Sequence, residues 1–125
     1  MEEQRYLEIM RRHMQEFYLL DEQQVEEILP SCLGTLFEHV QRLEALQQEG
    51  DAGALAKASH AVRGALLNLG LFDLAEYVCQ VETRCEELDD LPTCRSLLAE
   101  LRRKLQPLYS LTPPSPGAGL VQETW

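Results

Sequence analysis

His60 is the residue whose type and surroundings point most clearly to chemistry. It lies in a stretch, residues 53–70, in which apolar side chains recur with the period of an α-helix. At about 100° per residue these side chains gather on one face, and the His60 imidazole points almost directly away from them. They are Leu55, Ala58, Val62, Ala65, Leu66 and Leu69. A neutral imidazole that faces solvent offers a ring nitrogen that can act as a nucleophile.

The residues beside His60 indicate room for an anion. Lys57 and Arg63 lie three residues away on either side and flank the ring with positive charge. Ala56 and Gly64 lie four residues away and leave space, because they have almost no side chain. A glycine inside a helix costs about 1 kcal/mol relative to alanine, so Gly64 indicates that this position serves either packing or access to the ring. We interpret this arrangement as a site that binds an anion and a partner protein.

The helix around His60 carries only part of an active site. Leu67 projects to nearly the same side as His60, and an apolar side chain there favours a docking surface. The chain has no Ser/His/Asp arrangement, no HExxH motif, no glycine-rich phosphate loop and no histidine–carboxylate cluster for a metal. An imidazole between two cations can receive a phosphoryl group, and the rest of the chemistry would come from a partner.

The other histidines and the cysteines are expected to be structural. His13 lies near an apolar face and is predicted to be a partly buried packing residue, whereas His39 is predicted to be a solvated surface residue. The four cysteines form no CxxC pair, which argues against a zinc or thioredoxin-like site. Cys32, Cys85 and Cys94 fall on apolar stripes, so we expect reduced thiols that pack as small hydrophobic groups.

Composition narrows the possible partners. With 125 residues and 45% apolar content, the chain is expected to form one helical domain with a modest core. The net charge of −10 argues against a nucleic-acid partner, because phosphate backbones bind basic surfaces. No apolar run approaches the roughly 20 residues that span a bilayer, and residues 1–3 do not resemble a secretion signal. We therefore expect a cytoplasmic protein without membrane insertion.

Several helical stretches would hold His60 in place. Apolar side chains recur at helical spacing over residues 3–20, 25–50, 51–69, 71–88 and 94–108, and no stretch is a strand candidate. Asp21 and Asp51 are candidate helix caps, and Gly70 is expected to end the His60 helix. Pro30 either opens a new helix or kinks a continuous one. Residues 89–92, Asp-Asp-Leu-Pro, are expected to break the pattern before the last helix.

These helices predict an all-α fold, an antiparallel four-helix bundle with an additional N-terminal helix. We expect an amphipathic helix over residues 1–20 packed on the bundle, the bundle itself over 21–109, and a flexible Pro/Gly-rich tail over 110–125. The exposed apolar residues of the first helix leave two possibilities open. They either cap the bundle or form a dimer.

The register around His60 resembles a known family. His-Ala-Val-Arg-Gly-Ala at residues 60–65, Asn-Leu-Gly at 68–70, Leu-Ala at 74–75 and Val-Glu at 81–82 are similar to the histidine-containing phosphotransfer (HPt) domain, and the likeness covers about residues 21–108. The resemblance implies that His60 accepts the phosphoryl group, that Arg63 orients the phosphate and that Gly64 keeps the ring accessible. The sequence departs from the common pattern at Ala61, Arg63 and Ala65, where threonine, lysine and serine are frequent.

The resemblance also implies a function. The chain would be a phosphocarrier rather than an enzyme, relaying a phosphoryl group between receiver-domain aspartates through phosphohistidine at His60. Its partners would be response regulator receiver domains or a hybrid sensor histidine kinase. The receiver would supply the aspartate and Mg²⁺, so the chain would need no cofactor. One alternative is a helical binding module that docks or sequesters a response regulator without carrying phosphate. A self-contained enzyme such as a phosphatase would need an acidic or polar group near His60 that the sequence does not place.

Overall fold

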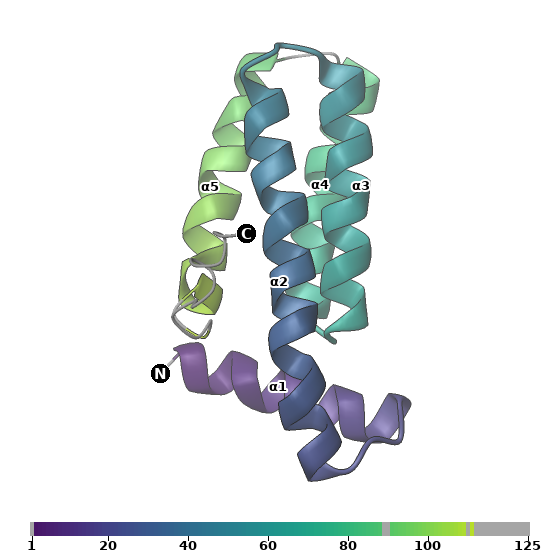
Figure 1. The fold of residues 1–125 in the computed structure, drawn as a ribbon. Helices are drawn as coiled ribbons and strands as arrows, with labels where there is room; N and C mark the ends of the chain where they lie inside the picture. Colours follow the sequence, from purple (N-terminus) through teal and green to yellow (C-terminus); the bar gives the residue numbers. More distant parts are fainter. Residues whose placement is uncertain (1, 89–90, 110, 112–125) are drawn as a thin grey trace, which may run out of the picture.

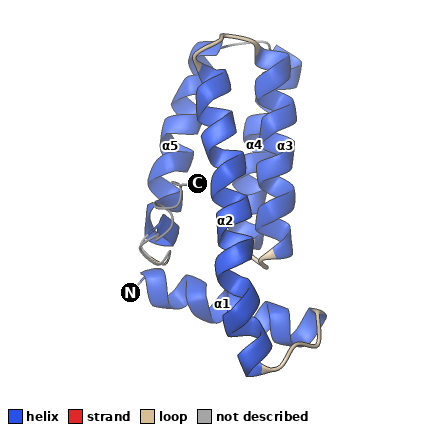
Figure 2. Cartoon of the chain, in the orientation of Figure 1, coloured by secondary structure: helices blue, strands red, loops and turns tan. Residues whose placement is uncertain are grey.

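Five helices make up the described part of the chain. The computed structural model describes residues 2–88, 91–109 and 111. The helices are α1 (Glu2–Phe17), α2 (Glu22–Gln47), α3 (Ala52–Asn68), α4 (Phe72–Leu88) and α5 (Leu91–Tyr109). Helices α2 to α5 stand side by side and alternate in direction, while α1 crosses beneath one end (Figure 1). Short loops join α1 to α2, α2 to α3 and α3 to α4, and no strand occurs in the described residues (Figure 2). The predicted all-α four-helix bundle with an added N-terminal helix is confirmed.

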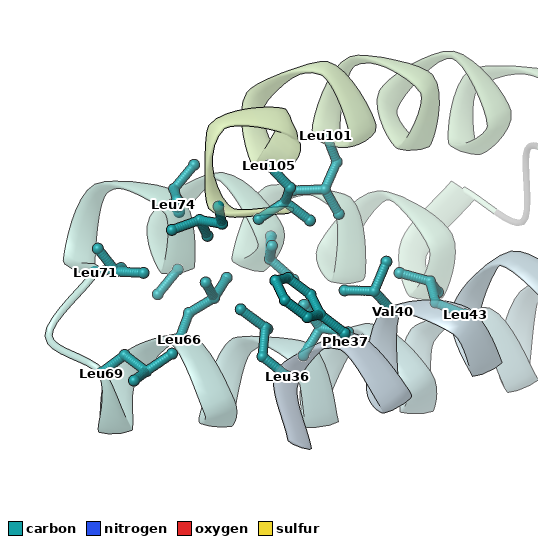
Figure 3. Close-up of a cluster of buried hydrophobic side chains, with 14 of the residues drawn as sticks. Leu36, Phe37, Val40, Leu43, Leu66, Leu69, Leu71, Leu74, Leu101 and Leu105 are labelled. Atoms are coloured by element: carbon teal, nitrogen blue, oxygen red, sulfur yellow. The ribbon is translucent and has the colours of Figure 1, made fainter. Parts of the chain in front are cut away.

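The core lies along the axis of the bundle, between α2, α3, α4 and α5. Each helix contributes a stripe of buried leucines and other apolar side chains. Figure 3 labels Leu36, Phe37, Val40, Leu43, Leu66, Leu69, Leu71, Leu74, Leu101 and Leu105. Burying one such leucine stabilises a fold by roughly 1.5–3 kcal/mol. The stripes therefore fix how each helix is rotated about its axis, and with it the face that α3 presents to solvent.

Asp21 and Asp51 cap helices α2 and α3 as predicted. Asp21 Oδ1 accepts a hydrogen bond from the Gln24 N–H at 2.8 Å, and the Gln24 side chain accepts one from the Asp21 N–H at 2.9 Å. Asp51 Oδ1 accepts from the Ala54 N–H at 3.2 Å. Each bond satisfies a donor that the first turn of a helix leaves free. The two caps set where the long helices begin.

Pro30 and Pro92, the two prolines at which the sequence predicts a helix start, a kink or a break, behave differently from one another. Pro30 lies inside α2, which is continuous, so the alternative in which it opens a new helix is wrong. Pro92 lies in the first turn of α5, where its missing N–H costs nothing, so the predicted break does not extend to Leu91 and Pro92. The other two residues of that break, 89–90, lie outside the described residues. So does the predicted tail over 110–125, apart from residue 111.

Helix α1 caps one end of the bundle. Met10 and Met14 are fully or almost fully buried and belong to the common core. The helical spacing of Met10, Met14 and Phe17 in the sequence predicts one apolar face, yet Phe17 is 66% exposed. Helix α1 ends there, so Phe17 extends past the core that Met14 enters. Within the described residues, no helix is both long and apolar enough to cross a lipid bilayer.

Gly70 is required at the turn between α3 and α4. Its φ of +80° is in the left-handed region, and a Cβ there would lie 2.5 Å from the Cβ of His13. We expect Gly70→Ala to lower the free energy of unfolding by about 2 kcal/mol, because strain and overlap add. Chemical denaturation measures this change in the free energy of unfolding. The matched control is Gly34→Ala in α2, where a new Cβ meets nothing within 4 Å and stability should not fall. Equal stability of both variants would contradict the conclusion that the turn requires glycine at position 70.

Candidate functional site

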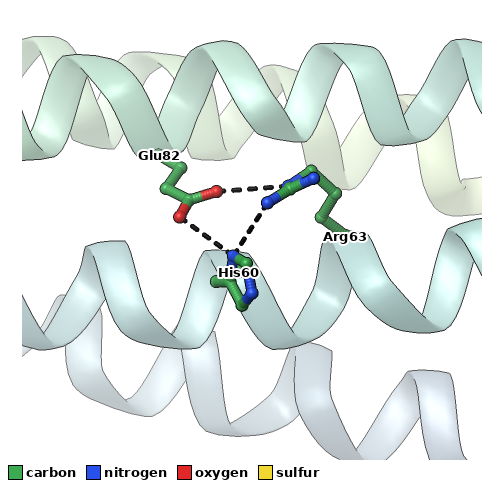
Figure 4. Close-up of polar contacts among 3 residues, drawn as sticks. All are labelled: His60, Arg63 and Glu82. Carbon is green, nitrogen blue, oxygen red and sulfur yellow. Dashed lines mark hydrogen bonds and ion pairs between the residues drawn. The ribbon is translucent and has the colours of Figure 1, made fainter.

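His60 lies midway along α3 with its side chain 64% exposed. Its ring is turned so that Nδ1 faces α4 and Nε2 points away from the neighbouring side chains (Figure 4). Among the residues that the structure describes, Nε2 has no hydrogen-bond partner. The ring therefore presents one nitrogen to the protein and the other to solvent.

Glu82 of α4 and Arg63 of α3 hold the inner side of the ring. Glu82 Oε2 lies 3.1 Å from His60 Nδ1, and its other oxygen accepts a hydrogen bond from Arg63 Nε at 3.2 Å. Arg63 Nη2 lies 2.8 Å from the same His60 Nδ1 (Figure 4). The Glu82 side chain is only 16% exposed and that of Arg63 28%, so water screens this pair less than an open surface pair.

The proton on Nδ1 decides which of these contacts is a hydrogen bond. If Nδ1 carries the proton, it donates to Glu82, and Glu82 then receives one bond from His60 and one from Arg63. If Nδ1 is unprotonated, it accepts a hydrogen bond from Arg63, and the Glu82 carboxylate then faces the lone pair of Nδ1. The first arrangement satisfies the part-buried carboxylate with two donors, and it requires the Arg63 Nη2 group, a donor that lies 2.8 Å from Nδ1, to turn away from the Nδ1–H. It leaves the lone pair on the exposed Nε2.

Ala56 does not clear space around His60, which corrects the sequence prediction. Ala56 is 2% exposed and belongs to the hydrophobic core. It shares one stripe of α3 with Ser59 and Arg63, and Arg63 bonds to Glu82 of α4. That stripe faces α4, so the small side chain of Ala56 serves the packing of the two helices and does not face solvent.

The other residues predicted near the ring are placed differently from one another. Gly64 and Leu67 are exposed on α3, and Leu67 is 38% exposed. Lys57 lines a groove of about 250 Å³ between α2 and α3, together with His39 and Arg42. Within the described part of the chain, no hydrogen bond or ion pair joins Lys57 to His60. Of the two predicted cations, the structure brings only Arg63 into contact with the ring.

Gly64 is not required by the packing of the chain itself. A Cβ built at this position meets nothing within 4 Å. We expect Gly64→Ala to raise the free energy of unfolding by about 1 kcal/mol, because alanine favours the helix interior. Thermal denaturation measures this change. A destabilised variant would show that Gly64 has a structural role in the chain, and the access interpretation would then lose its support.

Glu82 is the site residue that sequence reasoning missed. The pair Val81-Glu82 is part of the sequence pattern that resembles the family. The sequence between residues 60 and 82 does not, however, predict that the Glu82 carboxylate faces the His60 imidazole. The available signal is an acid on the polar face of the helix that follows His60. To place this acid beside His60, one must know how α4 is rotated about its axis relative to α3. The buried apolar stripe of α4 determines that rotation. The structure thus places an acidic group, the Glu82 carboxylate, beside His60, where the sequence alone predicts none.

The remaining candidate residues have structural surroundings. His13 is half-buried and packs against the rings of Phe17, Tyr18 and Phe72 at centroid distances of 4.8, 5.5 and 5.5 Å. His39 is half-buried rather than fully solvated. Cys85 and Cys94 are buried, and Cys32 is partly buried, which raises the pKa of its thiol. Among the described side chains, no three His, Cys, Asp or Glu residues gather as metal ligands.

Comparison with known proteins identifies the family. A family model, the Hpt domain, matches residues 27–109, which is more than half of the chain. No curated protein and no solved structure matches the chain significantly. The matched range contains His60 together with Arg63 and Glu82, the two residues that contact its ring. Hpt domains act in histidine phosphotransfer in two-component systems, where they interact with receiver domains and histidine kinases. The chain is a member of the Hpt domain family.

Proposed function

We propose that this protein is a phosphorelay intermediate that carries a phosphoryl group on Nε2 of His60 between the aspartates of receiver domains. The observation that supports this most directly is the orientation of the ring. Glu82 and Arg63 occupy the Nδ1 side, and the exposed nitrogen is the one that a partner can reach. An in-line reaction needs a nucleophile with a free lone pair held in a fixed direction, and this arrangement supplies one.

The proposed transfer needs no proton movement on this chain. The Nε2 lone pair attacks the phosphorus of a receiver aspartyl phosphate, an N–P bond forms, and the P–O bond to the aspartate breaks. The aspartate leaves as a carboxylate, and the imidazole becomes positively charged with its proton still on Nδ1. Glu82 lies 3.1 Å from that nitrogen and would offset the new charge. The reverse sequence passes the group to the aspartate of a second receiver.

Arg63 would neutralise phosphoryl charge when a receiver is bound. Its guanidinium already lies beside the ring, and a short rotation of the side chain would carry Nη2 from Nδ1 toward the phosphoryl oxygens. Lys57 and Arg42 would add a weaker positive field from the α2–α3 groove. The receiver would contribute Mg²⁺ together with its aspartate, so this proposal assigns no metal to the chain.

Transfer of label from a receiver tests the proposal. Receiver domains from the same genome are phosphorylated with radiolabelled acetyl phosphate and Mg²⁺ and then mixed with the chain. We expect label on the chain that is labile in acid and stable in alkali, as a phosphoramidate is, and expect it to return to a second receiver. Tight binding to a receiver without any transfer of label would contradict the relay and favour the binding-module alternative.

A further inference from the structure

A cavity of about 360 Å³ lies between α1, the start of α4 and the second half of α5. These three segments meet at the end of the bundle that α1 crosses (Figure 1). Tyr77, one of the lining residues, precedes Glu82 by five positions, which is about 140° around α4, so the cavity and His60 lie on different faces of that helix. The volume is within the range of about 300–1,000 Å³ in which proteins hold small molecules. The proposed relay gives this cavity no role.

Apolar and aromatic side chains form much of the lining of this cavity. Leu71 and Leu74 are buried and belong to the common core, and Ile9 of α1 is half-buried against it. Phe72, at the start of α4, lines the same cavity and is 54% exposed. The ring of Tyr77 adds a second aromatic surface, while its hydroxyl already donates to a main-chain carbonyl of α5 at 3.1 Å. An apolar or aromatic group placed here would cover the exposed Phe72 ring, and this burial favours binding.

Two helices contribute positive charge to the cavity. Arg5 of α1 and Lys104 of α5 both line it, and Asp73 is the carboxylate in its described lining. Two cations against one carboxylate leave an excess of one positive charge, although the whole chain carries −10. Among the described residues neither cation forms an ion pair, and Lys104 Nζ lies 5.1 Å from the centre of the Tyr77 ring. The cavity therefore favours a ligand with a single negative charge.

We infer that this cavity, named here the α1–α5 cavity, binds a small organic anion that has an apolar or aromatic body and a single carboxylate or sulfonate group. The body would lie against the rings of Phe72 and Tyr77, and the anionic group would pair with Arg5 and Lys104. A bound ligand would contact α1, α4 and α5 at once and so hold the N-terminal helix on the bundle. Arg5 precedes the range that the family model matches, so this site depends on the chain's own N-terminal extension. The inference does not depend on the relay.

Binding of anilinonaphthalene sulfonate, an aromatic sulfonate that fluoresces in apolar sites, tests the inference on the full chain. We expect saturable binding, and a melting temperature that rises with the probe, because a ligand of the native state stabilises it. Arg5→Gln and Lys104→Gln should each raise the Kd about fivefold. The controls Arg12→Gln and Arg95→Gln remove the same charge from exposed positions of α1 and α5 outside the cavity and should leave the Kd unchanged. No binding to the wild type, or equal affinity in the wild type and all these variants, would overturn the inference.

An uncharged analogue separates the anionic group of the ligand from its apolar body. Phenylnaphthylamine has similar rings and no sulfonate, so its Kd should be the same for the wild type and Lys104→Gln and should rise in Phe72→Ala. A Kd for this analogue that rises in Lys104→Gln as much as the Kd of the sulfonate would contradict the role assigned to the charge.

Backbone amide shifts in ¹H–¹⁵N NMR spectra locate the bound sulfonate. They should change around Ile9, Phe72 and Tyr77 and stay constant around His60. Changes confined to the α2–α3 groove, or a melting temperature that falls as the probe is added, would overturn the inference. His60→Gln should bind the probe as the wild type does, so the loss of phosphoryl uptake in that variant and the loss of probe binding in Lys104→Gln are separate results.

Discussion

His60→Gln is expected to lower phosphoryl uptake from a receiver by more than about a thousandfold, because the variant has no nucleophile at the site. The side chain is 64% exposed, so glutamine fits there without a cavity or a clash. We expect the free energy of unfolding to change by less than about 1 kcal/mol. Label retained on the chain after mixing with a phosphorylated receiver gives the transfer rate, and chemical denaturation gives the stability.

His39→Gln is the control for that variant. His39 is half-buried and lines the α2–α3 groove with Lys57 and Arg42, so it has positive neighbours of its own but no contact with Glu82. The control should take up label at nearly the wild-type rate. If His60→Gln kept its label while His39→Gln lost it, the phosphoryl group would belong on the other histidine and the assignment of the site would be wrong.

The second large effect is expected at Glu82. Glu82→Ala should slow transfer about a hundredfold, because the positive charge that forms on the imidazole loses its counter-ion and Nδ1 loses its acceptor. Glu82→Gln should recover part of the rate, since its amide oxygen still accepts from Nδ1–H but carries no charge. The rate is measured at saturating receiver, where docking no longer contributes. The control is Glu76→Gln, an exposed glutamate on the same helix, which should leave the rate unchanged.

A spectroscopic measurement separates positioning by Glu82 from a loss of structure. The ¹⁵N chemical shifts of a neutral imidazole report which ring nitrogen carries the proton. In the wild type we expect the His60 proton on Nδ1, in Glu82→Gln still mainly on Nδ1, and in Glu82→Ala a shift toward the other tautomer, since Arg63 Nη2 then remains as the donor to Nδ1. An unchanged tautomer in Glu82→Ala would leave Glu82 without a positioning role.

The sequence predicted the elements that periodicity controls. The spacing of apolar residues placed His60 on the outer face of its helix, and the buried stripe of α3 bears this out, because that stripe and the exposed ring lie on opposite sides. Asp21 and Asp51 were recognisable as caps because capping depends on residues only three positions apart. Local patterns of this kind determine the helices and their order.

Features that depend on how two helices face each other could not be predicted in this way. Ala56 and Gly64 look alike in the sequence, but α4 covers the first and leaves the second open. Glu82 reaches His60 across 22 positions, and only the packing of α4 on α3 brings the two together. Leu19 looks like the end of an apolar run, and its left-handed conformation follows from where α1 stops. Each outcome depends on tertiary contacts.

The most direct test of the central claim is an NMR measurement on chain labelled with ¹⁵N in its histidine rings and phosphorylated by a receiver. We predict a one-bond ³¹P–¹⁵N coupling at Nε2 of His60, with the ring signals of His13 and His39 unchanged and the His60 Nδ1 proton retained. Coupling at Nδ1 of His60, or at either of the other histidines, would contradict the account, because it would mean that the exposed nitrogen that Glu82 and Arg63 leave free does not receive the phosphoryl group.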